Sequence, residues 1–511
     1  MSSTEPTTRP APPATEPDPA RAPFALDAGT AELHVSTARG GTVGLLAQAC
    51  RFALLFGVQL VLARLLTPED FGLVAVVTSV ITFFSLFNDL GLPLATVQRS
   101  EINHEQVNLL FWVNTIWGVA LALITAACAP LVARLYDDPR LAPLLFANSA
   151  IFVLVGLGSQ HRAILRRRMR FTSIALVELL SLLAGSVLAV ALARVGFRSW
   201  ALILMRLATA TCATLGLLLS CGWLPTRPRL AEDVRPLLAF GTHVTALDMM
   251  GFVIRQADNL LIGWFRGPRA LGFYYKAYQM LLLPAQQFTM PLAGVVIPAL
   301  SRLQNEPRRY AAYYHKGILL SAAAGMPLVA FLFVGADWIV PLLLGGQWAE
   351  SVPLFLALAP AAFVGPVDVG SGWLVVSLGR TRRQVKWNLM ATMVTLAGFF
   401  VGIRWGALGV ALSFSACRVA LIIPKLMYTC VGSHVSWTVA VRAAARPAAA
   451  SLAAAAGLYA LTRQLPFMSH GLTGLAASGS CFVLMYIGVW AALPGGRRTL
   501  RGLFGLLHYL R

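Results

Sequence analysis

Long apolar stretches recur along most of the chain, separated by short breaks rich in charged residues, proline or glycine. Each stretch is close to the roughly 20 residues that a helix needs to cross the hydrocarbon core of a bilayer. The pattern predicts about fourteen membrane spans. They fall at 41–63, 71–98, 107–133, 141–161, 172–193, 199–221, 236–263, 272–299, 315–334, 351–378, 386–403, 406–428, 439–461 and 471–492. Within 335–378 the pattern is least regular, and Trp338–Leu344 is open to a second interpretation as a separate short helix.

Composition supports a membrane protein rather than a soluble one. Of the 511 residues, 57% are hydrophobic and 12% are charged, which is about half the charged fraction of ordinary soluble domains. The formal net charge is +20, but the positive residues lie in short loops between apolar stretches, as in membrane proteins. This distribution does not suggest a nucleic-acid partner.

The loop charges also predict the orientation of the chain. If the N-terminus is placed inside and the spans alternate, most arginines and lysines outside the spans fall on the inner side, among them those at 162–170, 302–316 and 380–386. We therefore expect a multi-pass protein of the plasma (inner) membrane with both termini cytoplasmic. Residues 1–40 are rich in proline, threonine and alanine, so we expect a disordered cytoplasmic tail without a cleaved signal peptide.

An internal repeat predicts how the spans are grouped. Thr67–Gly72 and Gly267–Gly272 both contain the pattern P-x-x-[FL]-G, and each follows the first span of a six-span block. Blocks that start from the same face are parallel repeats about an axis along the membrane normal. The expected fold is an all-α integral membrane protein with two pseudo-symmetric six-helix lobes and two further C-terminal helices. In order, the expected segments are the tail 1–40, the first lobe 41–221, a cytoplasmic linker 222–235, the second lobe 236–428, two spans in 429–492 and a basic cytoplasmic tail 493–511.

The same motifs resemble a known family. Leu62–Leu73, Asp89–Leu92 and Thr96–Arg99 in the first lobe resemble the signature of Wzx-type oligosaccharide-lipid flippases. Ala257–Gly263 and Leu271–Tyr274 resemble it in the second lobe, as does Pro298–Leu303. These flippases belong to the multidrug/oligosaccharidyl-lipid/polysaccharide flippase superfamily and act in lipopolysaccharide or exopolysaccharide biosynthesis.

The resemblance implies a two-lobed bundle around a central cavity. It implies a cargo, an undecaprenyl-diphosphate-linked oligosaccharide, that passes from the inner to the outer leaflet by alternating access. It also implies a polymerase and a chain-length regulator as partners. A drug or metabolite cation antiporter and a lipid II flippase of the same superfamily remain open as alternatives.

Enzymatic classes find little support in the sequence. The chain contains no G-x-x-x-x-G-K-[ST], H-E-x-x-H or G-x-S-x-G motif. The predicted outer loops are short, which leaves little room for the external active site of a polysaccharide polymerase or ligase. The seven cysteines form no CxxC or Cys/His cluster, so we expect no metal and no cofactor.

Ionisable residues inside apolar stretches are the best guide to a site, because a charge at the bilayer centre costs roughly 3 kcal/mol. Gln48, Arg51 and Gln59 lie on one face of the first span. We predict that they contact the cargo, since an arginine can donate two hydrogen bonds to a diphosphate. The alternative is a structural ion pair between Arg51 and an acid such as Asp89.

The seventh span carries a second set of charges, and Lys276 follows in the eighth span. Asp248, Arg255 and Asp258 share one helix face. Arg255 is a candidate for cargo binding, but an Arg255–Asp258 ion pair one helical turn apart is equally open. Lys276 could face the cavity or extend toward the outer interface.

Asp368 is the strongest candidate for binding a coupling ion, either a proton or sodium. It lies between Gly365-Pro366 and Gly370-Ser371-Gly372, and interrupted helices supply ion sites in transporters. The alternative is a kinked helix with a hydrogen-bonded carboxyl group. Asp89 has a similar setting, and Arg418 could pair with either acid.

Three further features favour structural roles. We expect Glu178 and Arg206 to pair with opposite charges. We expect the arginines of 162–170 to act mainly as determinants of topology.

Overall fold

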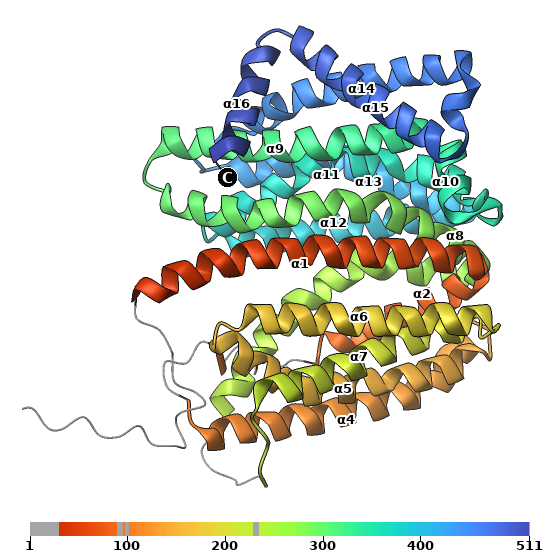
Figure 1. Cartoon of the computed structure of the whole chain (residues 1–511), viewed down its shortest axis with the longest axis vertical. Helices are drawn as coiled ribbons and strands as arrows, with labels where there is room; N and C mark the ends of the chain where they lie inside the picture. The colour runs from red at the N-terminus through yellow and green to blue at the C-terminus, as the bar shows by residue number, and fades with distance from the viewer. Residues whose placement is uncertain (1–29, 89–92, 94–95, 98–101, 228–234, 510–511) are drawn as a thin grey trace, which may run out of the picture.

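A computed structural model describes residues 30–88, 93, 96–97, 102–227 and 235–509, and these residues are almost entirely helical (Figure 1). The helices are α1 (Thr30–Leu65), α2 (Pro68–Ser85), α4 (His104–Leu135), α5 (Leu141–Arg167), α6 (Phe171–Arg194), α7 (Ser199–Cys221), α8 (Arg235–Arg302), α9 (Pro307–Val334), α10 (Ala336–Leu344), α11 (Ser351–Ser377), α12 (Thr381–Gly402), α13 (Gly406–Cys430), α14 (Trp437–Gln464), α15 (Gly471–Ala492) and α16 (Gly496–Tyr509). Short 3-10 turns η2 (Gly346–Trp348), η3 (Ile403–Trp405) and η4 (Pro466–Ser469) join some of them. Within the described residues, 10 stretches are long and apolar enough to cross a membrane. The protein is therefore a helical, multi-pass membrane protein, as the hydropathy pattern predicts.

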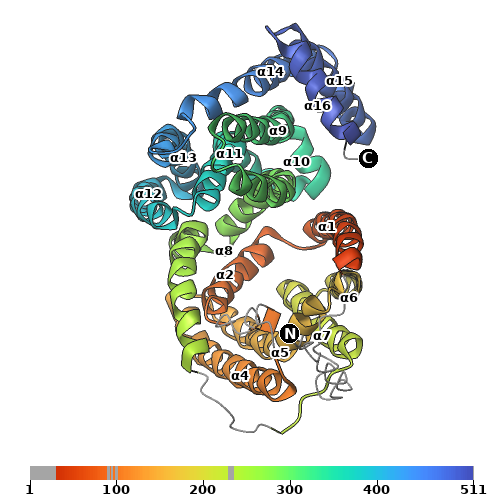
Figure 2. The same ribbon diagram turned by 90° about the vertical axis from the view of Figure 1, so that its left-hand side faces the viewer.

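The helices form two groups with a smaller third one beside them (Figure 2). The first group contains α1, α2 and α4–α7, and the second contains α9–α13. Helix α8 connects the two groups, packing on α2 as well as on α9 and α11. Helices α14 and α15 pack along α9 at the edge of the second group, where the Tyr486 hydroxyl donates a hydrogen bond to the Ala323 carbonyl at 3.1 Å.

Helix α8 consists of two antiparallel halves. Gly267 has φ 80° and ψ 174°, which no α-helix contains. The Tyr274 hydroxyl donates to an Asp258 carboxylate oxygen at 2.7 Å, although sixteen residues of straight helix would hold them about 24 Å apart. The chain therefore reverses at Gly267-Pro268, where the sequence predicts the turn between the seventh and eighth spans.

Some boundaries differ from the predicted ones. Helix α1 begins at Thr30, inside the segment expected to be a disordered tail. Helix α2 ends at Ser85 and is followed by a turn at 86–88, so the predicted continuous span 71–98 is wrong. Ala336–Leu344 forms the separate short helix α10. Helix α11 continues through Pro366 and Gly370 without a break, so the predicted helix interruption around Asp368 is wrong.

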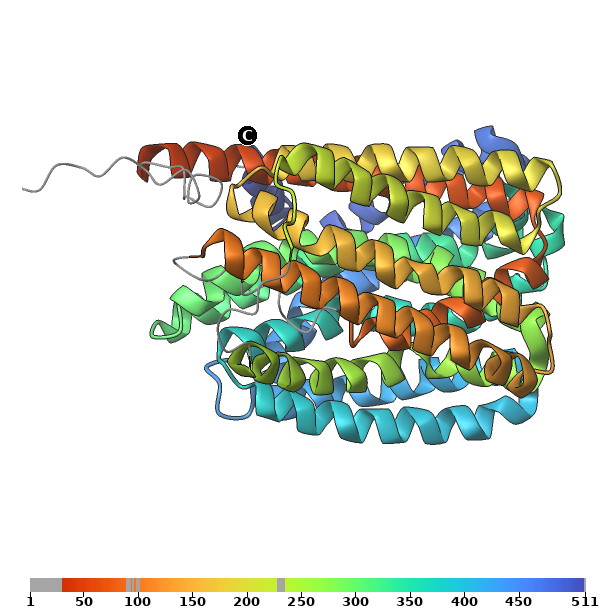
Figure 3. The same ribbon diagram turned by 90° about the horizontal axis from the view of Figure 1, so that it is seen from below.

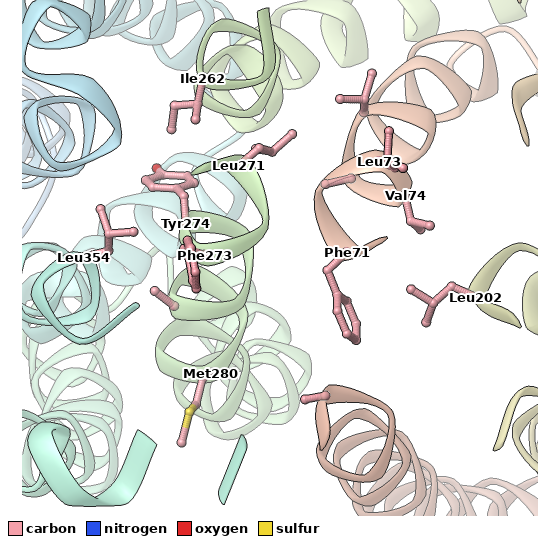
Figure 4. Close-up of a cluster of buried hydrophobic side chains, with 14 of the residues drawn as sticks. Phe71, Leu73, Val74, Leu202, Ile262, Leu271, Phe273, Tyr274, Met280 and Leu354 are labelled. Atoms are coloured by element: carbon pink, nitrogen blue, oxygen red, sulfur yellow. The ribbon is translucent and has the colours of Figure 1, made fainter. Parts of the chain in front are cut away.

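The two copies of the repeated motif pack against each other. A Cβ atom on Gly72 would lie 1.6 Å from the Pro268 carbonyl oxygen, and one on Gly272 would lie 1.7 Å from the Pro68 carbonyl oxygen. Such reciprocal contacts are those of a two-fold axis. Figure 4 shows the buried apolar side chains of α2 and of the second half of α8 on either side of this contact. Only glycine allows the two backbones to approach this closely.

Figure 3 shows the long helices running side by side between the two ends of the bundle. At the end where α10 lies, which we call the α10 end, side chains of each group cap helix ends of the other group. The last carbonyl groups of a helix have no partner inside it. The Trp348 indole N–H donates to the Ala63 carbonyl of α1 at 2.7 Å, and the Gln347 amide donates to the same carbonyl at 2.6 Å. In return, the Arg64 guanidinium donates to the Leu342 carbonyl of α10 at 2.6 Å. We call these three hydrogen bonds from side chains to helix-end carbonyls the cross-cap; they hold the two groups together at the α10 end.

Candidate functional site

A cavity of about 780 Å³ lies inside the first group. It is lined by α1, α2, α5, α6 and α7, with Tyr275 from α8. Arginines predominate among its charged residues, which are Arg51, Arg162, Arg166, Arg206 and Glu178. The cavity is large enough for a polar head group and has the charge to hold an anion.

Glu178 joins two of these arginines. The Arg51 guanidinium donates to Glu178 at 3.0 Å, and Arg162 forms an ion pair with its other carboxylate oxygen at 2.7 Å. The expected pairing of Glu178 is confirmed. Arg51 has an ion-pair partner, but that partner is Glu178, and Asp89 lies outside the described residues. The trio keeps one positive charge in excess.

Arg206 was expected to pair with an acid, and this prediction is wrong within the described residues. It is half-buried on α7, where it lines the cavity, and its guanidinium donates to the Thr78 hydroxyl of α2. A guanidinium within a membrane-spanning helix that lacks an acidic partner is costly. Together with Arg166, which has no acidic partner in the described part of the chain, it leaves the cavity with unneutralised positive charge.

Lys276 faces the interior, so extension of its side chain to the outer interface is excluded. It is 2% exposed, and its ammonium group donates to the Gln59 side-chain oxygen at 2.6 Å. It also lies 4.0 Å from the centre of the Phe71 ring, a favourable cation–π geometry. Gln59 lines both the large cavity and a second one of about 270 Å³, which Lys276 also lines. Gln48 is exposed on α1 and is not part of the large cavity's lining.

Arg255 and Asp258 of the seventh span do not form the ion pair that was one of the two alternatives. Asp258 is buried and accepts from the Tyr274 hydroxyl and from the Asn259 backbone N–H. Arg255 is exposed and makes no ion pair with it among the described residues. The side chain of Asp248 lies outside the described residues. Neither Arg255 nor Asp258 lines the large cavity, so the structure does not bring them together with Arg51.

Asp368 lies in a second charged cluster, between α11 and α13. It accepts from Arg418 at 2.8 Å and from Lys425 at 2.6 Å. Of the two acids that we considered as partners of Arg418, Asp89 and Asp368, the structure pairs it with Asp368. Sequence reasoning missed Lys425, although it follows Arg418 by two helical turns and so lies on the same face.

We expect Asp368→Asn to lower the free energy of unfolding by about 1–3 kcal/mol, because two cations would share one neutral amide. Thermal unfolding in a mild detergent measures this change. Asp337→Asn, at an exposed position, is the control and should have almost no effect. Asp368→Asn with Lys425→Met should recover part of the loss; no recovery would mean that charge balance is not what the cluster provides.

The fold is similar to that of two solved membrane proteins. A lipid II flippase MurJ in an inward closed conformation superposes with a TM-score of 0.68 at 13% identity, covering 91% of this chain and 98% of that one. An inward-facing multidrug resistance transporter of the MATE family gives a TM-score of 0.60 at 12% identity, covering 75% and 95%. The protein therefore has the fold of the multidrug/oligosaccharidyl-lipid/polysaccharide flippase superfamily.

Sequence comparison then gives the family. Residues 61–353 match the model described as polysaccharide biosynthesis protein, and the chain belongs to this family. The lipopolysaccharide biosynthesis protein WzxC of Escherichia coli K12 is 26% identical over 70% of this chain and 74% of its own length. The succinoglycan biosynthesis transport protein ExoT of Rhizobium meliloti 1021 is 28% identical over 60% of this chain and 62% of its own length. The resemblance seen in the sequence motifs is thus confirmed.

Proposed function

We propose that the protein is a flippase that carries an undecaprenyl-diphosphate-linked oligosaccharide from the inner to the outer leaflet of the plasma membrane. The observation that carries this proposal is the arginine-lined cavity in the first group of helices. The names of the relatives add support, since one is a lipopolysaccharide biosynthesis protein and another a succinoglycan transport protein. The work proposed is binding and movement of the cargo rather than catalysis.

The cavity suits a diphosphate because of its excess of guanidinium groups. Arg51 and Arg162 already orient toward one carboxylate, Glu178. Phosphate oxygens can replace that carboxylate as acceptors, since guanidinium groups bind both in the same forked geometry. Arg206 and Arg166 would supply the remaining positive charge. Lys276 and Gln59, where the large cavity meets α8, would contact the first sugars.

Movement of the cargo would follow alternating access. The cross-cap closes the α10 end of the bundle, which the positive-inside distribution of loop charges assigns to the outer face. The arginine-rich turns and both ends of the described chain would then be cytoplasmic. Cargo would enter from that side, and release would require the cross-cap to open. Asp368 with Arg418 and Lys425 is our candidate for the coupling site, where a proton or sodium ion would compete with the two cations for the carboxylate.

The proposal is tested in a strain that lacks the gene, by determining which lipid-linked sugar accumulates and in which leaflet. We expect intact undecaprenyl-diphosphate oligosaccharide in the inner leaflet. Normal delivery with unpolymerised units outside would instead indicate a polymerase or ligase. Accumulation of lipid II would indicate that the protein carries lipid II instead of the lipid-linked oligosaccharide.

Complementation of that strain with Arg51→Ala tests the cavity itself. We expect transport to fall about tenfold or more, because loss of a charged hydrogen bond to a phosphate costs about 1.5–3 kcal/mol. Arg134→Ala, at an exposed position at the α10 end of α4, is the matched control. Transport at the wild-type rate by Arg51→Ala at equal expression would remove Arg51 from the site.

A further inference from the structure

The last helix, α16, has a position and a charge pattern that the transport proposal does not explain. In Figures 1 and 2 it runs crosswise to the long helices, at the end of the bundle opposite α10. A helix in this orientation lies along the membrane surface instead of crossing it. This end also holds the arginine-rich segments 162–170 and 380–383, at the end of α5 and the start of α12.

The turn before α16 fixes its direction. Gly495 has φ +70°, a conformation that L side chains rarely adopt. A Cβ atom on Gly496 would lie 1.7 Å from the Trp490 carbonyl oxygen, so the chain folds tightly over the end of α15. Pro494 and the two glycines after it therefore end α15 and redirect the chain, so that α16 crosses the end of α15.

The sequence of α16 is amphipathic. With 3.6 residues per turn, Arg497, Arg498 and Arg501 occupy one arc of the helix, and Leu500 lies on the other. The positions of Leu503, Phe504 and Leu507 fall on the same arc as Leu500. Leu500 packs against the apolar cluster that contains Trp490, whereas the three arginines are exposed.

Further positive charge comes from α14. Arg446 donates to the Thr499 hydroxyl of α16 at 3.1 Å, and Arg442 lies one helical turn away and is also exposed. No acid balances them nearby in sequence, since Asp368 is the only acidic residue after Glu350. Asp368 itself is bonded to Arg418 and Lys425.

We infer that α16, with Arg442 and Arg446 of α14, is a binding surface for the anionic head groups of membrane lipids. An amphipathic helix with clustered arginines binds such lipids through its buried apolar arc and its charges together. The bound lipids anchor the α14–α15 pair to one leaflet while the two main groups of helices move. Lipid phosphates supply the negative charge that this part of the chain lacks.

The test uses the full-length protein in detergent micelles, titrated with phosphatidylglycerol or phosphatidylcholine while native mass spectrometry counts the bound lipids. The variant R497Q/R498Q/R501Q should bind phosphatidylglycerol roughly ten- to hundredfold more weakly, as expected for three charges near a lipid surface. Its binding of phosphatidylcholine should not change. R497K/R498K/R501K keeps the charge and should retain most of the binding.

A matched control removes three exposed arginines from the α10 end, as R134Q/R194Q/R404Q. It should bind phosphatidylglycerol as the wild type does. Equal loss in the control and in the α16 variant would mean that only the net charge matters, and the inference would fail. Equal loss of phosphatidylcholine in the α16 variant, or no loss at all, would also overturn it.

Discussion

Arg206→Gln is expected to abolish most transport while leaving the protein at least as stable as the wild type. Arg206 lines the large cavity from α7, and among the described residues its hydrogen-bond partner is the neutral Thr78 hydroxyl. A guanidinium that contributed only to the fold would be paired with an acid, because an unpaired one costs free energy. The guanidinium of Arg206 therefore destabilises the empty protein, and an anionic cargo would offset this destabilisation by pairing with it.

Losing a buried charged contact to the cargo costs about 2–5 kcal/mol, so we expect transport to fall roughly thirtyfold or more. The leaflet distribution of the lipid-linked sugar in a complemented deletion strain measures transport, and thermal unfolding measures stability. Arg206→Lys should be intermediate, since it retains the charge but not the planar fork.

The matched control is Arg194→Gln, at the exposed end of α6, which should behave like the wild type. Two results would contradict the role of Arg206. One is transport at the wild-type rate by Arg206→Gln. The other is a loss of transport accompanied by a proportional loss of folded protein, which would show a structural residue.

Gly72→Ala is expected to prevent the two halves of the protein from assembling correctly. The single added methyl group would lie 1.6 Å from the Pro268 carbonyl oxygen. Unlike a flexible side chain, this backbone carbonyl cannot rotate away from the added methyl group. The two helices must therefore separate. Overpacking in a rigid core usually costs about 1–3 kcal/mol, and we expect more than about 4 kcal/mol where backbone is the obstacle.

The amount of monodisperse protein in size-exclusion chromatography and the midpoint of thermal unfolding measure this effect. Gly272→Ala should cause a loss of similar size, because its methyl group would lie 1.7 Å from the Pro68 carbonyl oxygen. Gly57→Ala on α1 is the control: nothing lies within 4 Å of its added Cβ atom, and alanine favours helix. If Gly72→Ala unfolds at the same temperature as Gly57→Ala, the close packing of the two motifs is not essential.

The sequence predicted the helical class and the internal repeat because both depend on local patterns. An apolar stretch long enough to span a membrane can be recognised without knowing which helices pack against it. The two P-x-x-[FL]-G motifs could be matched by their position in each block. The end of α2 at Ser85 was missed, since the residues after it remain apolar and hydropathy does not distinguish a helix from a turn. The short helix α10 was foreseen only as an alternative.

The candidate site was predicted less completely, because ion pairs between helices depend on how each helix is rotated about its axis. Arg51 lines a charged cavity, and its contact with the cargo stays a prediction. Nothing in the sequence links it to Glu178, which is 127 residues away. From the sequence, Arg206 was expected to pair with an acid. Its place in the cavity lining depends on how α7 packs against its neighbours, which the sequence does not show. Lys425 could have been found from its spacing to Arg418.

The cross-cap would set a threshold for the opening motion that the proposed release of cargo requires. Its donors and acceptors belong to opposite groups of helices, so a small separation at the α10 end breaks the bonds of Trp348, Gln347 and Arg64 together. Bare helix-end carbonyls would then remain without partners until water reaches them. Partly opened forms are therefore high in free energy. We expect the α10 end to open cooperatively and infrequently. The waiting time before each opening, more than the speed of the cargo within the cavity, would then limit how many molecules cross per second.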